Sequence, residues 1–264
     1  MKKIWLSLKH GKVHCYQLGS GPRLVIALHG FAHSGASFQT MGLGDGYTVY
    51  APDLPFHGLT EWHADAFDQQ DFKELVEAIL ALNPGQPFYW LGYSLGGRLV
   101  LSEWKGFAPQ LAGLILIAPD GLGSGVRAIP HRMPLFLRQW LCGLLERPNW
   151  FLKWSRFLKK VGIIDHFSDQ YLHKNLGTTE NRRRLLGTWK SVSHFKLKQR
   201  KAPTPNFPIF VVLGRRDRII MPEVIHPLKK CFPKAVVIWR DCGHQLINRE
   251  TGIILRKQLN KEPD

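Results

Sequence analysis

Residues 90–101 read Trp-Leu-Gly-Tyr-Ser-Leu-Gly-Gly-Arg-Leu-Val-Leu and join a strand pattern, a glycine-framed turn and the start of a helix. The apolar run over 87–91 is short enough to predict a buried parallel strand. Residues 99–101 resume an apolar pattern without glycine or proline, which favours a helix packed against a sheet. Between them, residues 92–96 (Gly-Tyr-Ser-Leu-Gly) fit G-x-S-x-G, so we expect a sharp turn there.

This turn predicts where the hydroxyl group of Ser94 lies. A sharp strand-to-helix turn holds the serine in a strained backbone conformation at the carboxyl end of the strand. The glycines on either side, Gly92 and Gly96, leave room for strand and helix to approach each other. The backbone N–H of Leu95, beside the helix N-terminus, would face a developing oxyanion. Strand, turn and helix together are the context of a nucleophile elbow.

Length and composition predict an α/β domain with an insertion. The chain has 264 residues, of which 44% are hydrophobic and 21% charged. Residues 1–9 are basic and only briefly apolar, unlike a signal peptide, and no apolar run approaches the roughly 20 residues of a membrane span. We therefore expect a cytoplasmic protein without stable membrane insertion. The cysteines, Cys15, Cys142, Cys231 and Cys242, lack C-x-x-C spacing, which predicts neither a metal site nor a disulfide framework.

Positive charge is concentrated in one third of the chain. The net charge is +16, and residues 121–205 hold 17 Lys and Arg against 4 Asp and Glu. This concentration of positive charge favours an anionic substrate, nucleic acid or an acidic membrane surface, although a solvated basic surface is the other interpretation. No nucleic-acid-binding motif is present, so no nucleic-acid partner is expected. No cofactor is predicted, and the oligomeric state is left open.

Strand and helix patterns alternate along most of the chain. This alternation is typical of a mostly parallel sheet with helices on both faces, which is an α/β fold. Predicted strands cover 3–8, 12–18, 23–28, 47–51, 87–91, 111–118, 207–213 and 235–239. Predicted helices start near 34 and cover 68–82, the stretch after Ser94, and 247–259.

The composition changes at Gly121. From there to 205 the chain is rich in Trp, Phe, Arg and Lys, with helical patterns at 135–145 and 150–160 and few strand signals. We interpret 121–205 as a helical cap inserted into a core formed by 1–120 and 206–264. Aromatic residues of the cap either line a substrate pocket or form the cap's own core.

Three polar residues each follow a predicted strand. They are Ser94, Asp217 and His244, and the carboxyl ends of parallel strands share one edge of a sheet. A serine hydroxyl is a poor nucleophile until a base takes its proton. We expect His244 to be that base and Asp217 to orient its imidazole ring.

The strand over 23–28 leads directly into His29-Gly30-Phe31. The glycine allows a tight turn, so the backbone N–H of Phe31 can face Ser94 as a second oxyanion donor. The alternative interpretation is that His29-Gly30 only forms a turn that ends the strand. The G-x-S-x-G motif later in the chain disfavours this alternative.

On these residues the chain resembles the α/β-hydrolase superfamily, in its capped branch of serine esterases, carbon–carbon bond hydrolases and lyases. The resemblance covers 23–120 and 206–260. The matching stretches are His29-Gly30-Phe31, Asp53-Leu54-Pro55-Phe56-His57-Gly58, Gly92-Tyr93-Ser94-Leu95-Gly96-Gly97, Gly214-Arg215-Arg216-Asp217 and Gly243-His244. The family loop usually reads Asp-x-Pro-Gly-His-Gly-x-Ser, whereas this chain has Phe56 and Thr60 at its glycine and serine positions. The serine at the elbow disfavours the related epoxide hydrolases and haloalkane dehalogenases, which need an aspartate there.

The resemblance implies several functions. The first is hydrolysis of a carboxylic ester or thioester, with substrate contacts expected from His29, Gly30, Tyr93 and Arg98. The second is carbon–carbon bond chemistry, because Gly-Tyr-Ser-Leu-Gly-Gly-Arg resembles the menaquinone-pathway synthase that eliminates pyruvate from a polycarboxylate. There Tyr93 and Arg98 would meet the anionic substrate, although Arg98 also suits a salt-bridged helix residue. The third, a non-catalytic ligand-binding protein, is disfavoured by an intact Ser-Asp-His set.

Overall fold

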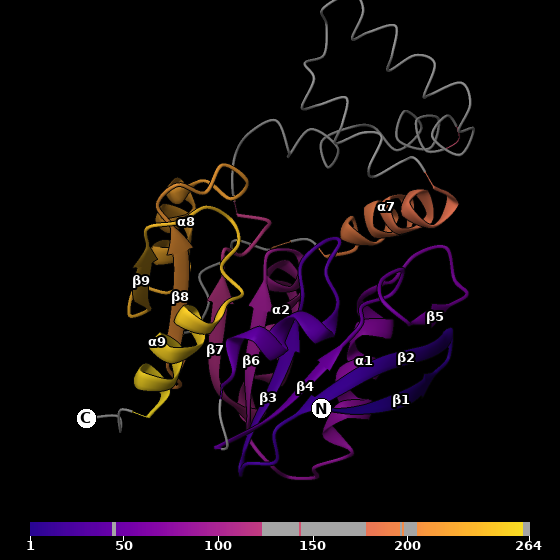
Figure 1. Cartoon of the computed structure of the whole chain (residues 1–264), viewed down its shortest axis with the longest axis horizontal. Coiled ribbons are helices and arrows are strands. Elements are labelled where there is room, and N and C mark those ends of the chain that lie inside the picture. Colours follow the sequence, from indigo (N-terminus) through magenta and orange to yellow (C-terminus); the bar gives the residue numbers. More distant parts are fainter. Residues whose placement is uncertain (44–45, 123–142, 144–177, 196, 198–204, 261–264) are drawn as a thin grey trace, which may run out of the picture.

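The computed structural model describes residues 1–43, 46–122, 143, 178–195, 197 and 205–260. Its centre is a nine-stranded sheet in the order β1-β2-β4-β3-β6-β7-β8-β9, with β5 paired to β2 (Figure 1). The strands are β1 (Lys2–Leu8), β2 (Gly11–Leu18), β3 (Arg23–Leu28), β4 (Tyr47–Pro52), β5 (Glu61–Trp62), β6 (Phe88–Tyr93), β7 (Leu111–Ile117), β8 (Ile209–Gly214) and β9 (Val236–Arg240). The helices are α1 (Gln69–Leu80), α2 (Leu95–Phe107), α7 (Thr179–Val192), α8 (Ile225–Cys231) and α9 (Arg249–Leu259), with 3₁₀ turns at Gly35–Met41, Ala108–Gln110 and Pro222–Val224.

The sheet is mostly parallel, which confirms the predicted fold class. β2 pairs antiparallel with β1, β4 and β5, whereas every neighbouring pair from β4 to β9 is parallel. The register places Leu28 opposite Gly92, so β3 and β6 end side by side. The carboxyl ends of β3, β6, β8 and β9 therefore meet at one edge of the sheet, where ligands of such folds bind.

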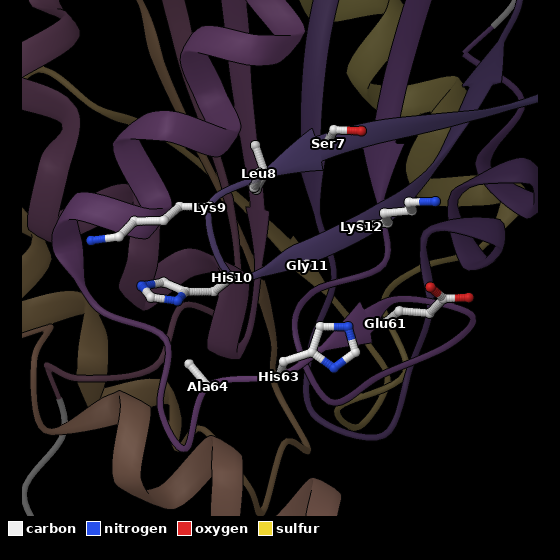
Figure 2. Close-up of a pocket in the computed structure, with 9 residues that line it drawn as sticks. All are labelled: Ser7, Leu8, Lys9, His10, Gly11, Lys12, Glu61, His63 and Ala64. Atoms are coloured by element: carbon white, nitrogen blue, oxygen red, sulfur yellow. The ribbon is translucent and has the colours of Figure 1, made fainter.

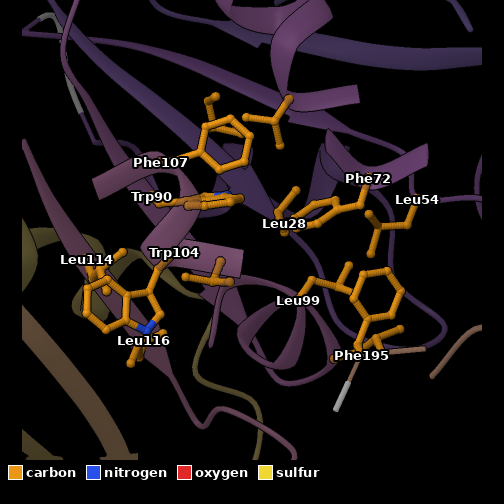
Figure 3. Packing of buried hydrophobic residues seen from close by; sticks show 14 of the residues in the cluster. Leu28, Leu54, Phe72, Trp90, Leu99, Trp104, Phe107, Leu114, Leu116 and Phe195 are labelled. Carbon is orange, nitrogen blue, oxygen red and sulfur yellow. The ribbon is translucent and has the colours of Figure 1, made fainter. Parts of the chain in front are cut away.

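Each central strand contributes to two apolar layers because neighbouring side chains point to opposite faces. Trp90 belongs to a core shared with α1, α2 and α8, whereas its neighbour Leu91 belongs to a core shared with α9 and the 3₁₀ turn after β3. In the first core the Trp90 ring stacks 5.6 Å from Phe72 of α1 and lies edge-on at 5.2 Å to Phe107 of α2 (Figure 3). Helices thus cover both faces, as the alternating pattern predicts.

The sequence of helix α1 explains where the helix begins and which of its faces is buried. Asp68 caps it by accepting the N–H groups of Gln70 and Asp71, and the Asp71 carboxylate accepts the Asp68 N–H in return. Its apolar residues recur at helical spacing and are buried. The helix ends at Leu80, two residues before the predicted end at 82.

One described helix, α7, lies within the segment 121–205. Figure 1 shows it across one end of the sheet. Its Ser191 hydroxyl accepts the Phe67 N–H at 2.8 Å, which fixes the helix to the core. The predicted helices at 135–145 and 150–160 lie outside the described residues, apart from Gly143, and the cap boundaries stay a prediction. Within the described ranges, no helix is long and apolar enough to cross a membrane.

Candidate active site

Ser94 occupies the turn between β6 and α2 with an unusual backbone. Its φ of 51° and ψ of −111° are strained for a residue other than glycine. Three main-chain hydrogen bonds hold it there: its N–H donates to the Ile117 carbonyl at 2.9 Å, and its carbonyl accepts the N–H groups of Asp120 at 2.9 Å and Arg98 at 3.3 Å. The surrounding backbone therefore maintains the strained conformation that the sequence predicts.

Glycines around Ser94 let the elements pack closely. A Cβ atom on Gly92 would lie 2.7 Å from the Gly96 carbonyl oxygen, and one on Gly96 would lie 2.1 Å from the Leu28 carbonyl oxygen. The Gly96 N–H donates to the His29 carbonyl at 3.1 Å. The start of α2 thus sits directly on the end of β3, a spacing that a side chain at 96 would prevent.

The fold brings the three predicted polar residues together. His244 Nε2 lies 3.1 Å from Ser94 Oγ, and His244 Nδ1 lies 2.7 Å from Asp217 Oδ2. The other carboxylate oxygen, Asp217 Oδ1, accepts the N–H groups of Ile219 at 2.7 Å and Ile220 at 2.9 Å. Because an ionised carboxylate only accepts, Nδ1 of the imidazole carries the proton. Nε2 is then left to accept the proton of the serine hydroxyl.

Tyr93 is tied to the loop that carries His244, and the substrate contact predicted for it stays a prediction. Its side chain is 1% exposed, and its hydroxyl donates to the His244 carbonyl at 2.8 Å. Its ring also lies against the His244 ring at 5.2 Å. Burial raises the pKa of Tyr93, and the nearby Asp217 carboxylate raises it further. Tyr93 therefore holds the loop that carries His244.

Arg98 forms an ion pair within the protein, and its predicted substrate contact stays a prediction. Its Nε donates to Asp120 Oδ2 at 3.0 Å, and the arginine side chain is only 10% exposed. The ion pair joins α2 to the segment after β7, whose Asp120 N–H also binds the Ser94 carbonyl. The salt-bridge interpretation of Arg98 is the one that fits the structure.

His29 supports the turn after β3. It is fully buried, its Nδ1 donates to the Gly30 carbonyl at 2.8 Å, and its Nε2 accepts the Leu54 N–H at 2.9 Å. Both ring nitrogens are thus engaged within the protein, and the predicted substrate contact of His29 stays a prediction. Burial lowers the pKa of His29, and the neighbouring His57 lowers it further, so the ring stays neutral.

Gly30 and Phe31 bring the turn up to the serine. A Cβ atom on Gly30 would lie 3.1 Å from Ser94 Cβ, so this position touches the elbow. The backbone N–H groups of Phe31, next to Gly30, and of Leu95, next to Ser94, stay the predicted oxyanion donors.

The loop after β4 is built around a buried carboxylate. Asp53 accepts the N–H of Gly35 at 2.7 Å and that of Leu59 at 3.0 Å, and it lies 3.0 Å from Nδ1 of His14. Thr60, at the family's serine position, donates to the Asp53 carbonyl and accepts the His14 N–H at 3.1 Å. The threonine thus supplies the hydroxyl contacts that close the loop.

His57 was not predicted from the chemistry of the site. Its ring lies 5.1 Å from that of His29 and 5.7 Å from that of Phe31, and its Nδ1 donates to the Pro55 carbonyl at 3.0 Å. Burial lowers the pKa of His57 to about 4. In the sequence, His57 stands out only as part of the loop motif Asp53-Leu54-Pro55-Phe56-His57-Gly58. That motif does not predict that His57 packs against His29 and Phe31.

The buried neutral state of His57 predicts a loss of stability in acid. An unfolded histidine has a pKa of about 6.5. Between that value and the folded pKa of about 4, the unfolded chain binds a proton that the folded chain excludes, so stability falls as the pH drops through this window. From pH 7 to pH 5, His57 should remove about 2 kcal/mol.

The measurement is urea unfolding of the wild type and His57→Phe at both pH values. The loss between pH 7 and pH 5 should be smaller in the variant by about 2 kcal/mol. His226→Gln, at an exposed position of α8, serves as the control and should follow the wild type. Equal losses in wild type and His57→Phe would show that His57 can take a proton in the folded protein.

A surface pocket of about 430 Å³ lies away from the serine, at the turn between β1 and β2 and the end of β5 (Figure 2). None of Ser94, Asp217 and His244 lines it. Figure 2 shows Lys9 and His10 pointing away from Lys12 and Glu61, so its polar groups do not converge on a ligand. Among the described residues, no group of three or more His, Cys, Asp or Glu side chains could hold a metal ion.

Comparisons with known proteins agree with the fold. The model of the alpha/beta hydrolase family matches residues 25–252. A pimeloyl-[acyl-carrier protein] methyl ester esterase of Xylella fastidiosa (strain M12) is 38% identical over 210 residues, covering 76% of this chain and 78% of that protein. Its counterpart from strain 9a5c is 29% identical over 223 residues, covering 81% and 84%. A thermophilic esterase structure from Thermogutta terrifontis aligns with a TM-score of 0.72 at 15% identity and covers 99% of both chains, which shows a shared fold.

Proposed function

The chain belongs to the alpha/beta hydrolase family, and we propose on that basis that it hydrolyses a carboxylic ester or thioester through an acyl-enzyme formed on Ser94. The observation that carries this proposal is the continuous hydrogen-bonded series from Ser94 Oγ through His244 to Asp217, at 3.1 and 2.7 Å. Such a series lets a proton leave the serine as its oxygen attacks.

In the first half of the reaction, Ser94 Oγ attacks the carbonyl carbon while His244 Nε2 accepts the hydroxyl proton. Asp217 stabilises the imidazolium that forms. When the tetrahedral intermediate collapses, His244 returns the proton to the leaving alcohol or thiol. In the second half, His244 activates a water molecule that releases the acid and restores Ser94.

The oxyanion of each tetrahedral intermediate would accept the N–H groups of Phe31 and Leu95. The Leu95 group lies at the N-terminus of α2, where the helix dipole also favours negative charge. The close approach of Gly30 to Ser94 supports this arrangement, because Phe31 is the next residue along the chain. Removal of one such donor costs about 10²–10³ in kcat in other serine hydrolases.

The relatives' names describe esterases that act on the methyl ester of a pimeloyl group borne by an acyl carrier protein. We propose that this chain likewise acts on an ester at the end of an acyl chain with an anionic carrier or anionic end. The basic composition of 121–205 supports this choice of substrate. The cytoplasmic location and the absence of a cofactor and of a nucleic-acid partner stay predictions.

The alternatives have less support. Carbon–carbon bond chemistry would use Tyr93 and Arg98 on the substrate, but these side chains bind the His244 carbonyl and Asp120. A non-catalytic binding protein has no need of a serine strained to a φ of 51° beside a base.

A fluorophosphonate probe tests the proposal. We expect it to modify Ser94 and to leave Ser102, on the following helix α2, unmodified, with peptide mass spectrometry locating the adduct. Hydrolysis of a monomethyl ester of a seven-carbon dicarboxylic acid should fall in proportion to the labelled fraction. Folded protein that stays unlabelled, or that keeps its esterase activity after full labelling, would refute the role of Ser94.

A further inference from the structure

A basic groove runs between α7 and the segment that follows β5. It has a volume of about 260 Å³ and is bounded on the α7 side by Arg182, Arg183 and Lys190. Asp65 is the acidic residue in its lining. The excess of positive charge suits an anionic group.

The guanidinium of Arg183 is fixed on the wall of this groove by donating to the Trp62 carbonyl. An arginine carries five N–H donors in a planar fork, so the contact with one carbonyl leaves further N–H donors on the Arg183 guanidinium. A guanidinium held in this way matches the oxygens of a phosphate or carboxylate group.

Phe56 separates the groove from a second, apolar cavity. The second cavity is about 20 Å³ in volume and is lined by Leu95 and Leu99 of α2 among other residues. Phe56 lines both spaces. Its ring packs so closely on α7 that a Cβ atom on Gly187 would lie 2.6 Å from it.

The backbone of Phe56 and the size of the second cavity both bear on how a substrate chain could pass. Phe56 has a φ of 69°, a conformation that favours the glycine usual at this position of the resembling family. A residue other than glycine is strained in this conformation, so packing against α7 has to offset the strain. A space of about 20 Å³ admits only a water-sized group, so a longer chain requires a lining side chain to move, and Phe56 is the one that also lines the groove.

We propose that the groove binds the anionic end of the substrate, a phosphate or a carboxylate, and that Phe56 selects the narrow acyl chain that passes from it toward Leu95. The positively charged groove suits the anionic end of such a substrate, and the apolar cavity beyond Phe56 suits the acyl chain that leads to its ester. This inference rests on the proposed function, since it takes Ser94 as the end point of the chain. It adds Arg182, Arg183, Lys190 and Phe56 as substrate-binding residues.

The test uses three esters that share one chain length and one methyl ester but end in a carboxylate, a phosphate or a methyl group. In Arg182→Met/Lys190→Met, KM for the charged esters should rise about fivefold or more at unchanged kcat, with the methyl-ended ester unaffected. Added salt should reduce the wild-type preference for charged esters. Whichever charged ester shows the larger change identifies the anion. Lys105→Met is the control: it removes a positive charge from α2, outside the groove lining, and should behave as the wild type.

Binding is measured separately so that failure of catalysis does not obscure the result. The Ser94→Ala protein is titrated calorimetrically with the same three esters, with and without the two α7 substitutions. Equal affinity for charged and uncharged esters, or an affinity unchanged by the α7 substitutions, would overturn the groove assignment even if Ser94 is the nucleophile. Retained charge selectivity in a protein without esterase activity would support the groove and refute the proposed function.

Phe56→Ala provides a second readout. It should raise kcat/KM for a branched acyl chain relative to a straight one by several-fold, because the two spaces become continuous. An unchanged branched-to-straight ratio in the folded variant would remove Phe56 from the substrate path.

Discussion

Asp217→Asn should lower kcat about 10⁴-fold while leaving the protein folded, the size of effect seen when the acid of a serine protease triad is changed in the same way. The expected loss is large because the substitution changes which imidazole nitrogen carries the proton. It does so without removing any side-chain volume from the site.

The hydrogen bonds of Asp217 dictate the orientation of the asparagine. Oδ1 accepts two backbone N–H groups, from Ile219 and Ile220, and only a carbonyl oxygen can replace it there. The amide NH₂ of the asparagine must then face His244 Nδ1. An NH₂ group donates, so Nδ1 has to accept and the proton moves to Nε2. Nε2 would donate to Ser94 Oγ and could no longer act as its base.

The measurement is steady-state hydrolysis together with the rate of fluorophosphonate labelling, both of which should fall. Asp241→Asn is the matched control, because that carboxylate lies three residues before His244 but is 78% exposed and pairs with Arg216. It should retain activity within about twofold, as expected for an exposed ion pair. A folded Asp217→Asn protein within tenfold of the wild type would show that His244 is oriented by another group.

The architecture is readable from the sequence because a parallel sheet buried on both faces demands uniform apolar strands. The predicted strands at 23–28 and 111–118 match β3 and β7 almost residue for residue. β5 was not predicted, since its two residues are too few to form a pattern. α7 was not singled out either, because Arg182, Arg183 and Arg184 interrupt the apolar spacing near its start.

Positions at the site were predictable, but the directions of side chains were not. Ser94, Asp217 and His244 follow strands whose ends must meet, so topology alone brings them together. Tyr93 and Arg98 stand beside the serine in sequence, yet their partners are the His244 carbonyl and Asp120, which the motif does not contain. Adjacency in sequence fixes where a Cα atom lies, whereas the partner of a side chain depends on distant segments.

Two glycine substitutions in α2 should change stability in opposite directions. In Gly96→Ala the new Cβ would lie 2.1 Å from the Leu28 carbonyl oxygen, so α2 has to move away from β3. We expect the free energy of unfolding to fall by about 3 kcal/mol, in the range of severe overpacking. Activity should fall as well, because the displaced helix start carries the Leu95 N–H.

Gly106→Ala, in the last turn of the same helix, meets no atom within 4 Å. There the substitution only lowers the entropy of the unfolded chain and improves helix propensity, so stability should rise by about 0.5 kcal/mol. Urea unfolding of both variants measures the difference. If Gly96→Ala were as stable as Gly106→Ala, α2 could shift along β3 at no cost. Ser94 would then lack the rigid support on which the proposed attack depends, since a nucleophile held in a strained turn is only as well placed as the helix behind it.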